Sequence, residues 1–301
     1  MQPLRLVAVL SVALISLAGL TACGSGPTSS KDVVEVVAGE NFWGDVVSQV
    51  GGSHVKVTSI ISNPDDDPHE YESSDRNAIA IATARLVVRN GLGYDDFLTK
   101  LVSASGAHPK VLTVADVLGV TGADANPHLW YDAPWLPEVA EAVATELGEL
   151  DPANKAEFEA NAKTFTQSLA PLLGVIGQIR SQYAGTPIAY TERVPGYLVQ
   201  AAGLTLGIPA SFAQSVEDGS DPSPHDTVAF NDAIKNGTVK VLLYNAQVTD
   251  AQTTEIKRLA TDSGVPIVGV TETMPPSYHH LQDWQLAQAK ALLEALQKAS
   301  R

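Results

Sequence analysis

The feature that most constrains the fold is an alternation of short apolar runs, rich in β-branched residues, with helix-like segments. Such runs are typical of strands in a parallel sheet, because helices cover both faces of that kind of sheet. Strands alternating with helices therefore indicate a parallel α/β lobe. In the first half of the chain the predicted strands are residues 33–39, 54–61, 84–91 and 110–116, and the predicted helices are residues 41–52, 73–84 and 135–151.

Helical periodicity then dominates the middle of the chain, over residues 151–184. Asp151 and Pro152 resemble an N-cap followed by proline at the first helical position. A helix of this length would span roughly 45 Å, which is enough to cross a whole domain. Pro171 lies inside the pattern and should kink the helix or divide it, because proline removes a backbone hydrogen bond.

The strand and helix alternation resumes after this stretch, which predicts a second lobe of the same class. We therefore predict an α/β fold of two lobes, residues 33–150 and 185–301, each with a parallel sheet flanked by helices. One long backbone helix, residues 151–184, joins them. The strands predicted in the second lobe are residues 186–192, 205–211, 239–245 and 265–272, and the helices are residues 226–237, 250–264 and 283–300.

The first 22 residues have the pattern of a lipoprotein signal peptide. Arg5 precedes an apolar run that is too short to span a bilayer comfortably, which takes roughly 20 apolar residues. The run ends in "LTAC", which resembles a bacterial lipobox, and Cys23 is the only cysteine of the chain. The lipobox implies cleavage before Cys23 and a lipid on its sulfur. An ordinary signal peptide with an incidental cysteine is the alternative.

Residues 23–32 are rich in glycine and serine and are interpreted as a lipidated tether. We therefore expect a mature protein outside the cytoplasm, anchored to the cell membrane by the lipid on Cys23. The net charge of −15 argues against a nucleic-acid partner, because phosphate binding needs clustered lysine and arginine. An acidic surface suits a protein that handles cations, and equally an ordinary acidic protein.

Four polar side chains stand where ligands gather in open α/β sheets, beyond the carboxyl ends of strands. His69 and His128 follow strands of the first lobe, and Glu192 and Glu272 end strands of the second. If the lobes face each other, two imidazoles and two carboxylates converge. This donor set suits a divalent first-row transition metal, whose charge the two carboxylates would balance.

Each of these residues also has a commoner role when taken alone. A histidine in a loop is more often a surface residue than a ligand, and Glu192 could pair with the adjacent Arg193. The chain has no HExxH motif and no paired cysteines. His279 and His280 form a rival pair that could supply a ligand or guard the cleft, although a surface loop is the commoner role.

Several sequence motifs together resemble those of one known family: the lipobox, "DPHEYESS", "NPHLWYD", "TERVPGYL" and "DPSPHD", with the long central helix. The chain is similar to the zinc and manganese receptors of bacterial ABC transporters, over the whole mature chain and in the same order. The resemblance implies two lobes, a rigid backbone helix, one metal between the lobes and delivery to a membrane permease. It implies four ligands: His69, His128, Glu192 and Glu272.

The chain departs from the family pattern at two ligand positions. Glu192 stands where many zinc-binding members have histidine and manganese-binding members often have glutamate. Glu272 stands where aspartate is usual, and it is one methylene longer. The loop before His128 also lacks the histidine-rich run of many zinc-binding members. The sequence therefore leaves zinc and manganese both open.

We expect a monomeric receptor rather than an enzyme, with one zinc or manganese ion as its transported ligand. Two alternatives remain at this level. A receptor for a metal chelate would need a roomy cleft lined with arginine or aromatic residues. A metal-dependent hydrolase would need an open coordination position and a separate general base, and four protein ligands leave neither clearly available.

Overall fold

The computed structural model describes residues 33–63, 71, 74–247 and 251–301. The chain from Val33 to Arg301 forms one compact unit. The predicted signal peptide, the tether with Cys23, and His69 lie outside the described residues. Within the part of the chain that the structure describes, none of the helices has both the length and the apolar character to cross a membrane.

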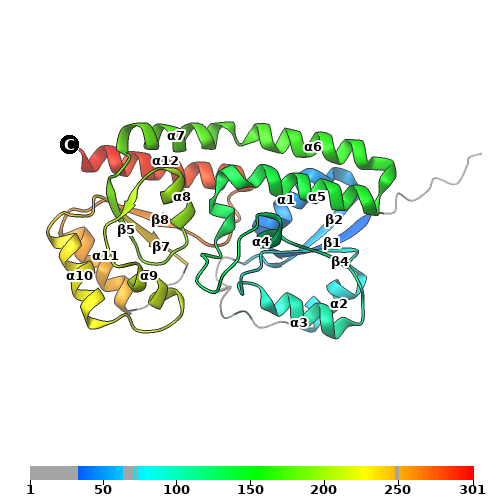
Figure 1. The fold of residues 1–301 in the computed structure, drawn as a ribbon, viewed down its shortest axis with the longest axis horizontal. Coiled ribbons are helices and arrows are strands. Elements are labelled where there is room, and N and C mark those ends of the chain that lie inside the picture. Colours follow the sequence, from blue (N-terminus) through cyan, green and yellow to red (C-terminus); the bar gives the residue numbers. More distant parts are fainter. Residues whose placement is uncertain (1–32, 64–70, 72–73, 248–250) are drawn as a thin grey trace, which may run out of the picture. The chain divides into compact units, whose positions relative to one another are not determined.

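The first sheet is parallel throughout, with the strand order β2-β1-β3-β4 (Figure 1). Its central strand β1 pairs Val36 with Val57 on one side and with Leu86 on the other. Helices α1 and α5 pack on one face of the sheet, and α2 and α3 on the other. The strands are β1 (Val34–Glu40), β2 (Val55–Ile61), β3 (Leu86–Arg89) and β4 (Lys110–Thr113). The helices are α1 (Asn41–Gly51), α2 (Asp75–Thr83), α3 (Asp96–Ser105), α4 (Val114–Val117) and α5 (Leu136–Leu150).

The second sheet repeats this arrangement with the order β6-β5-β7-β8, and it too is parallel. Its described strands are β5 (Pro187–Tyr190), β6 (Thr205–Leu206), β7 (Leu242–Asn245) and β8 (Ile267–Val270). Its helices are α8 (Gly196–Ala201), α9 (Ala210–Glu217), α10 (Pro224–Lys235) and α11 (Ala251–Asp262). The two parallel sheets confirm the predicted α/β class.

The predicted central helix is present as two helices in succession, α6 (Lys155–Ser168) and α7 (Ala170–Tyr183) (Figure 1). They are divided at Leu169, and Pro171 stands in the first turn of α7. Proline is tolerated there because the first N–H groups of a helix have no intrahelical acceptor. Helix α6 packs against α5 and α1, and α7 packs against the last helix, α12 (Leu281–Ala299). Four 3-10 turns complete the described helical elements: η1 (Gly52–His54), η3 (Leu129–Tyr131), η4 (Ala133–Trp135) and η5 (Pro152–Asn154).

Most predicted strands are slightly shorter in the structure, and two of them end well before the sequence pattern indicates. Of residues 205–211 only Thr205 and Leu206 pair in the sheet, and helix α9 begins at Ala210. Pro209 interrupts this run, because proline has no N–H to donate to a neighbouring strand. Strand β4 ends at Thr113 because the chain turns directly into α4. Helices α3, α4, α8 and α9 were not predicted.

An aromatic cluster from both halves of the chain forms the centre of the core. The Phe42 and Trp130 rings stack with centroids 4.1 Å apart, and Trp43 meets Phe42 edge to face. Trp284, on α12, packs within 5.9 Å of the Tyr131 ring and 6.5 Å of the Phe42 ring. The sheets therefore share one apolar core, and this core lies directly under the loop that carries His128.

Candidate metal centre

Three of the four predicted ligands belong to the described residues, and the fold brings them together. His128 directly precedes η3, while Glu192 and Glu272 each lie two residues beyond the end of a strand, β5 and β8. All three are buried, with 0%, 2% and 0% of their surface exposed. His128 Nε2 lies 3.8 Å from Glu272 Oε2, so ligands predicted in different lobes are neighbours.

Asn245 ties the two carboxylates to each other. It is the last residue of β7, the strand between β5 and β8, and its Nδ2 donates to Glu192 Oε2 and to Glu272 Oε1, at 2.9 Å each. Two buried carboxylates that share one donor repel each other and resist desolvation. A bound cation would remove that cost, so the pair has the electrostatics of a cation site.

Tyr94 reaches the same carboxylate from the turn between β3 and α3. Its hydroxyl donates to Glu272 Oε2 at 3.0 Å, and its ring lies edge to face with His128, with centroids 5.8 Å apart. Gln247 accepts from the backbone N–H groups of Glu272 and Thr273 at 2.5 Å and 2.9 Å. These polar contacts hold Glu272 from both halves of the chain.

The predicted four-ligand site stays a prediction, because His69 lies outside the described residues. Among the residues that the structure describes, no three His, Cys, Asp or Glu side chains are grouped so that they could hold a metal ion. The described geometry places one imidazole beside one carboxylate, and Asn245 links that carboxylate to a second one.

Two asparagines of the first half make hydrogen bonds to the backbone of the second half, one near Glu272 and the other next to Glu192. Asn41 makes two hydrogen bonds to Met274: its Nδ2 donates to the carbonyl oxygen at 2.8 Å, and its Oδ1 accepts from the N–H at 3.0 Å. Asn126 Nδ2 donates to the carbonyl oxygen of Arg193 at 2.8 Å. Met274 lies two residues after Glu272, and Arg193 directly follows Glu192, so hydrogen bonds attach the segments of both glutamates to the first half of the chain.

Arg193 pairs with a different acid from the one that the sequence suggested. Its Nη2 and Nε donate to the two carboxylate oxygens of Glu217, at 2.7 Å and 3.1 Å. This bidentate pair anchors the turn after β5. The arginine charge is therefore directed to Glu217, while the carboxylate of Glu192 is directed to Asn245.

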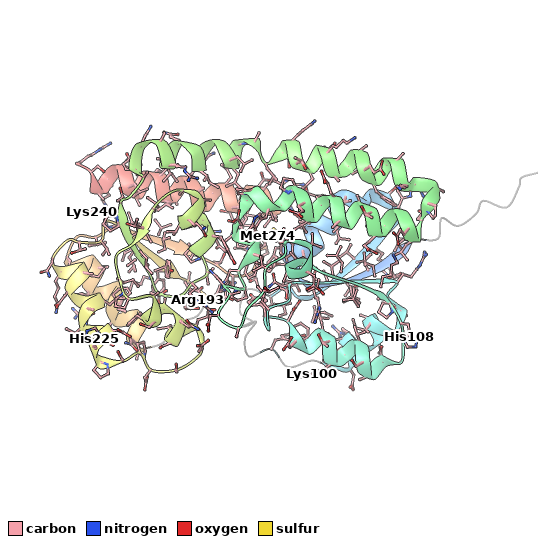
Figure 2. The ribbon with its side chains drawn as sticks, viewed as in Figure 1. Lys100, His108, Arg193, His225, Lys240 and Met274 are labelled. Atoms are coloured by element: carbon pink, nitrogen blue, oxygen red, sulfur yellow. The ribbon has the colours of Figure 1, made fainter. Side chains whose placement is uncertain are left out.

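The other histidines lie in different surroundings. His280 precedes α12, and its Nδ1 lies 3.1 Å from Asp45 Oδ1, while His279 is exposed. His225 stands in the first turn of α10 with 89% of its side chain exposed (Figure 2). His54 is buried against Glu157, with Nε2 and Oε2 3.0 Å apart. The structure thus places the rival pair beside α1 and α12.

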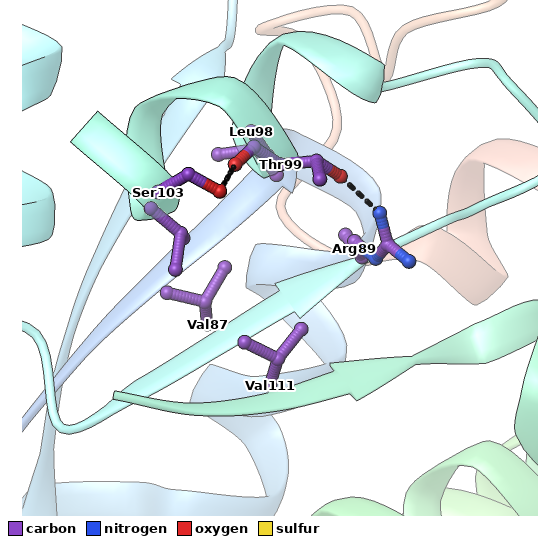
Figure 3. A pocket seen from close by; sticks show the side chains of 7 residues that line it. Val87, Arg89, Leu98, Thr99, Ser103 and Val111 are labelled. Atoms are coloured by element: carbon purple, nitrogen blue, oxygen red, sulfur yellow. Dashed lines mark hydrogen bonds between the residues drawn. The ribbon is translucent and has the colours of Figure 1, made fainter. Parts of the chain in front are cut away.

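A separate pocket lies between α3 and strands β3 and β4 (Figure 3). Apolar side chains dominate its lining, and Arg89 stands at one side, where it donates to the hydroxyls of Thr99 and Thr113. The residues that line it include none of the four predicted ligands. The arginine is already engaged by protein hydroxyls, so this pocket lends no support to the chelate alternative.

Two buried acids near the centre have perturbed pKa values. Burial, and then the nearby Asp95 carboxylate, raise the pKa of Glu40 well above its usual range. Neither oxygen of Glu40 accepts a hydrogen bond from another residue within the described chain. Burial also raises the pKa of Asp95 to about 6, although the backbone N–H groups of Gly91 and Asn90 oppose the shift.

These shifts predict that the metal-free protein loses stability as the pH rises from about 4 to about 7. A carboxyl group with a raised folded pKa holds a proton that the unfolded chain releases, so rising pH favours unfolding. Asp95 alone should account for up to about 3 kcal/mol across this window. Glu40→Gln should raise the free energy of unfolding at pH 7 and flatten its pH dependence, because it removes a group that the unfolded chain ionises more readily than the folded one.

Urea unfolding followed at several pH values checks this prediction. The exposed Glu141, on α5, provides the matched control, because Glu141→Gln should change neither the stability nor its pH dependence. A Glu40→Gln variant that is less stable than the parent at pH 7 would show that the carboxylate is ionised and stabilised in the folded protein.

Comparison with known proteins places this geometry in a family. The chain matches the family model of ZnuA, the periplasmic component A of a zinc-uptake complex, over residues 36–295. The chain belongs to this family. The membership confirms the resemblance carried by "DPHEYESS" and "NPHLWYD", and it accounts for the order of sheets and helices described above.

Individual relatives of the family are distant in sequence. The manganese ABC transporter substrate-binding lipoprotein scaA of Streptococcus gordonii is 24% identical, covering 89% of this chain and 88% of the relative. The manganese-binding lipoprotein MntA of Halalkalibacterium halodurans is 27% identical, covering 88% and 87%. The periplasmic zinc-binding protein TroA of Treponema pallidum shares the fold, with a TM-score of 0.73 at 18% identity over 87% of this chain and 98% of that one. A crystal structure of ZnuA gives a TM-score of 0.71 at 21% identity, over 89% and 99%.

Proposed function

We propose that this protein is an extracytoplasmic receptor that binds one zinc or manganese ion between its two sheets and delivers it to an ABC importer. The observation that carries the proposal is that His128, from a loop of the first half, lies beside Glu272 of the second half, and that Asn245 links Glu272 to Glu192. Membership of a zinc-uptake family and the names of the manganese-binding relatives support it.

His69 completes the ligand set in this proposal, on the strength of its match to the family motif. The site then has two imidazole nitrogens and two carboxylates, a donor set that balances the charge of a divalent ion. The protein acts by binding and release rather than by turnover, because four protein ligands leave no open position for a reacting water. The mature chain is a monomer anchored by a lipid on Cys23, with a membrane permease as its partner.

The test is a metal titration of the chain from Gly24 onward, stripped of metal. Zinc, manganese and iron(II) are added with calcium as the control, and the Tm and the bound metal per chain are measured. We expect one equivalent of zinc or manganese and a clear rise in Tm. A free metal concentration of 100 times Kd stabilises a folded protein by about 2.7 kcal/mol. Absence of binding by all the transition metals would contradict the receptor and favour the chelate alternative.

A further inference from the structure

Asn126 touches both halves of the candidate centre with one side chain. Its Oδ1 accepts a hydrogen bond from the backbone N–H of His128 at 3.1 Å and lies 2.6 Å from the ring Nδ1 of the same histidine. Its Nδ2 donates to the carbonyl oxygen of Arg193 at 2.8 Å. The amide group of Asn126 therefore contacts His128, a proposed ligand of the first half, and Arg193, the neighbour of the proposed ligand Glu192 in the second half.

The partners fix which way this amide points. The carbonyl oxygen of Arg193 can only accept, so the Asn126 amide nitrogen must face it. The amide oxygen then faces His128, whose backbone N–H can only donate. The ring Nδ1 at 2.6 Å must donate to that oxygen as well. In the neutral ring the proton is therefore on Nδ1, and the electron pair is on Nε2.

Nε2 is the ring nitrogen that faces the second sheet. It lies 3.8 Å from Glu272 Oε2, and both atoms offer electron pairs. Two ligands of a tetrahedral zinc ion are about 3.3 Å apart, given metal–ligand distances of about 2.0–2.1 Å. The ring orientation that Asn126 sets therefore directs His128 Nε2 toward the Glu272 carboxylate. The distance between these two atoms is close to the distance between two ligands of one zinc ion.

The start of α8, which follows the turn of Glu192, encloses Asn126 from the other side. The Tyr197 hydroxyl donates to the Asn126 carbonyl oxygen at 2.9 Å. Gly196 approaches so closely that a Cβ atom there would lie 2.7 Å from Asn126 Nδ2. A side chain at Gly196 would therefore push the amide away from Arg193. Asn126 therefore packs closely against Gly196 and Tyr197 at the start of α8.

We propose that Asn126 is a positioning residue that couples the two halves of the metal site. It holds His128 in the tautomer whose Nε2 can coordinate, and it fastens the turn of Glu192 to the loop of His128. The inference rests on the proposed function, since it concerns the ligands of that site. Asparagine suits both tasks, because an aspartate would accept from the ring but could not donate to the Arg193 carbonyl.

Three variants separate the two tasks. Asn126→Ala removes both contacts, Asn126→Asp keeps the acceptor for His128 and removes the donor, and Gly196→Ala disturbs only the side that faces the second half. Alanine at a helix start costs nothing in propensity, so Gly196→Ala should fold. His225→Ala, at an exposed position far from these contacts, is the control for the binding and NMR measurements.

Two readouts are measured for each variant: the affinities for zinc and manganese by competition titration, and the tautomer of His128 by ¹⁵N NMR on the metal-free protein. We expect Asn126→Ala to weaken binding by about 10- to 100-fold and to lose the fixed Nδ1–H tautomer. Asn126→Asp and Gly196→Ala should keep that tautomer and show a measurable loss of affinity that is smaller than the loss in Asn126→Ala, below about tenfold. His225→Ala should match the parent in both readouts.

Parent-like affinity in Asn126→Ala, or an unchanged tautomer in that variant, would overturn the proposal. If Asn126→Ala does not fold, the other two variants decide, and unchanged affinity in both would refute the coupling. A parent protein that binds neither metal would refute the proposed function instead. The tautomer of the metal-free protein would still show whether Asn126 orients the ring.

Discussion

Replacing Glu272 by alanine is expected to weaken the binding of zinc and manganese by more than about 100-fold. Loss of a group that merely orients a ligand costs about 10- to 100-fold, so loss of a ligand itself should cost more. Glu272 faces His128 Nε2 and accepts from both Tyr94 and Asn245, which places it at the centre of the contacts between the halves. Isothermal titration of the metal-free protein checks the affinity.

A substitution at Glu272 should affect the stability of the metal-free protein differently from its metal affinity. Glu272→Gln keeps the size and one acceptor oxygen but removes a negative charge beside Glu192. We expect the metal-free Glu272→Gln protein to have an unchanged or higher Tm, because two adjacent buried carboxylates repel each other. Residues that bind ligands often lower the stability of the ligand-free protein in this way.

The control for both measurements is Glu294→Ala, at an exposed position on α12. It should change neither affinity nor Tm. If Glu272→Ala folds and binds both metals as the parent does, Glu272 is not a ligand. If Glu272→Gln instead lowers the Tm clearly, the carboxylate has a structural role in the metal-free protein.

The second large effect is expected at Trp130. Its ring is fully buried, stacks on Phe42, and lies 5.2 Å from the His128 ring and 5.1 Å from that of Tyr94. Trp130→Ala should lower the free energy of unfolding by about 3–5 kcal/mol, because it opens a cavity in the shared core. It should also weaken metal binding, since His128 loses the surface against which its ring rests.

Phenylalanine variants provide a matched comparison within the same cluster. The Trp130 indole N–H donates to no residue in the described ranges, so Trp130→Phe loses packing but no hydrogen bond. Trp43 Nε1 donates to Asn90 Oδ1 at 3.2 Å, and Trp43→Phe leaves that buried acceptor with one partner fewer. In guanidinium unfolding, the Trp43→Phe protein should therefore have a lower free energy of unfolding than the Trp130→Phe protein. A loss under about 1 kcal/mol for Trp130→Ala would contradict the central packing role.

The class of fold could be predicted from the sequence because its signals are local. Unbroken apolar runs such as residues 33–39 specify buried parallel strands, and Pro171 divided the central helix close to where it was expected. The errors also have local causes. Residues 205–211 have a strand-like composition, but Pro209 ends the pairing and α9 begins in the same run.

The sequence by itself determined the two parallel sheets, the family motifs, and the choice of His128, Glu192 and Glu272 as candidate ligands. Only the tertiary structure decided what holds those ligands, because Tyr94, Asn126, Asn245 and Gln247 are ordinary loop and strand-end residues without periodicity. Tyr94 and Glu272 are 178 positions apart in the chain, and Asn126 and Arg193 are 67 apart. Hydrogen bonds over such separations depend on how the two sheets meet through one apolar core, and that packing leaves no local pattern in the sequence.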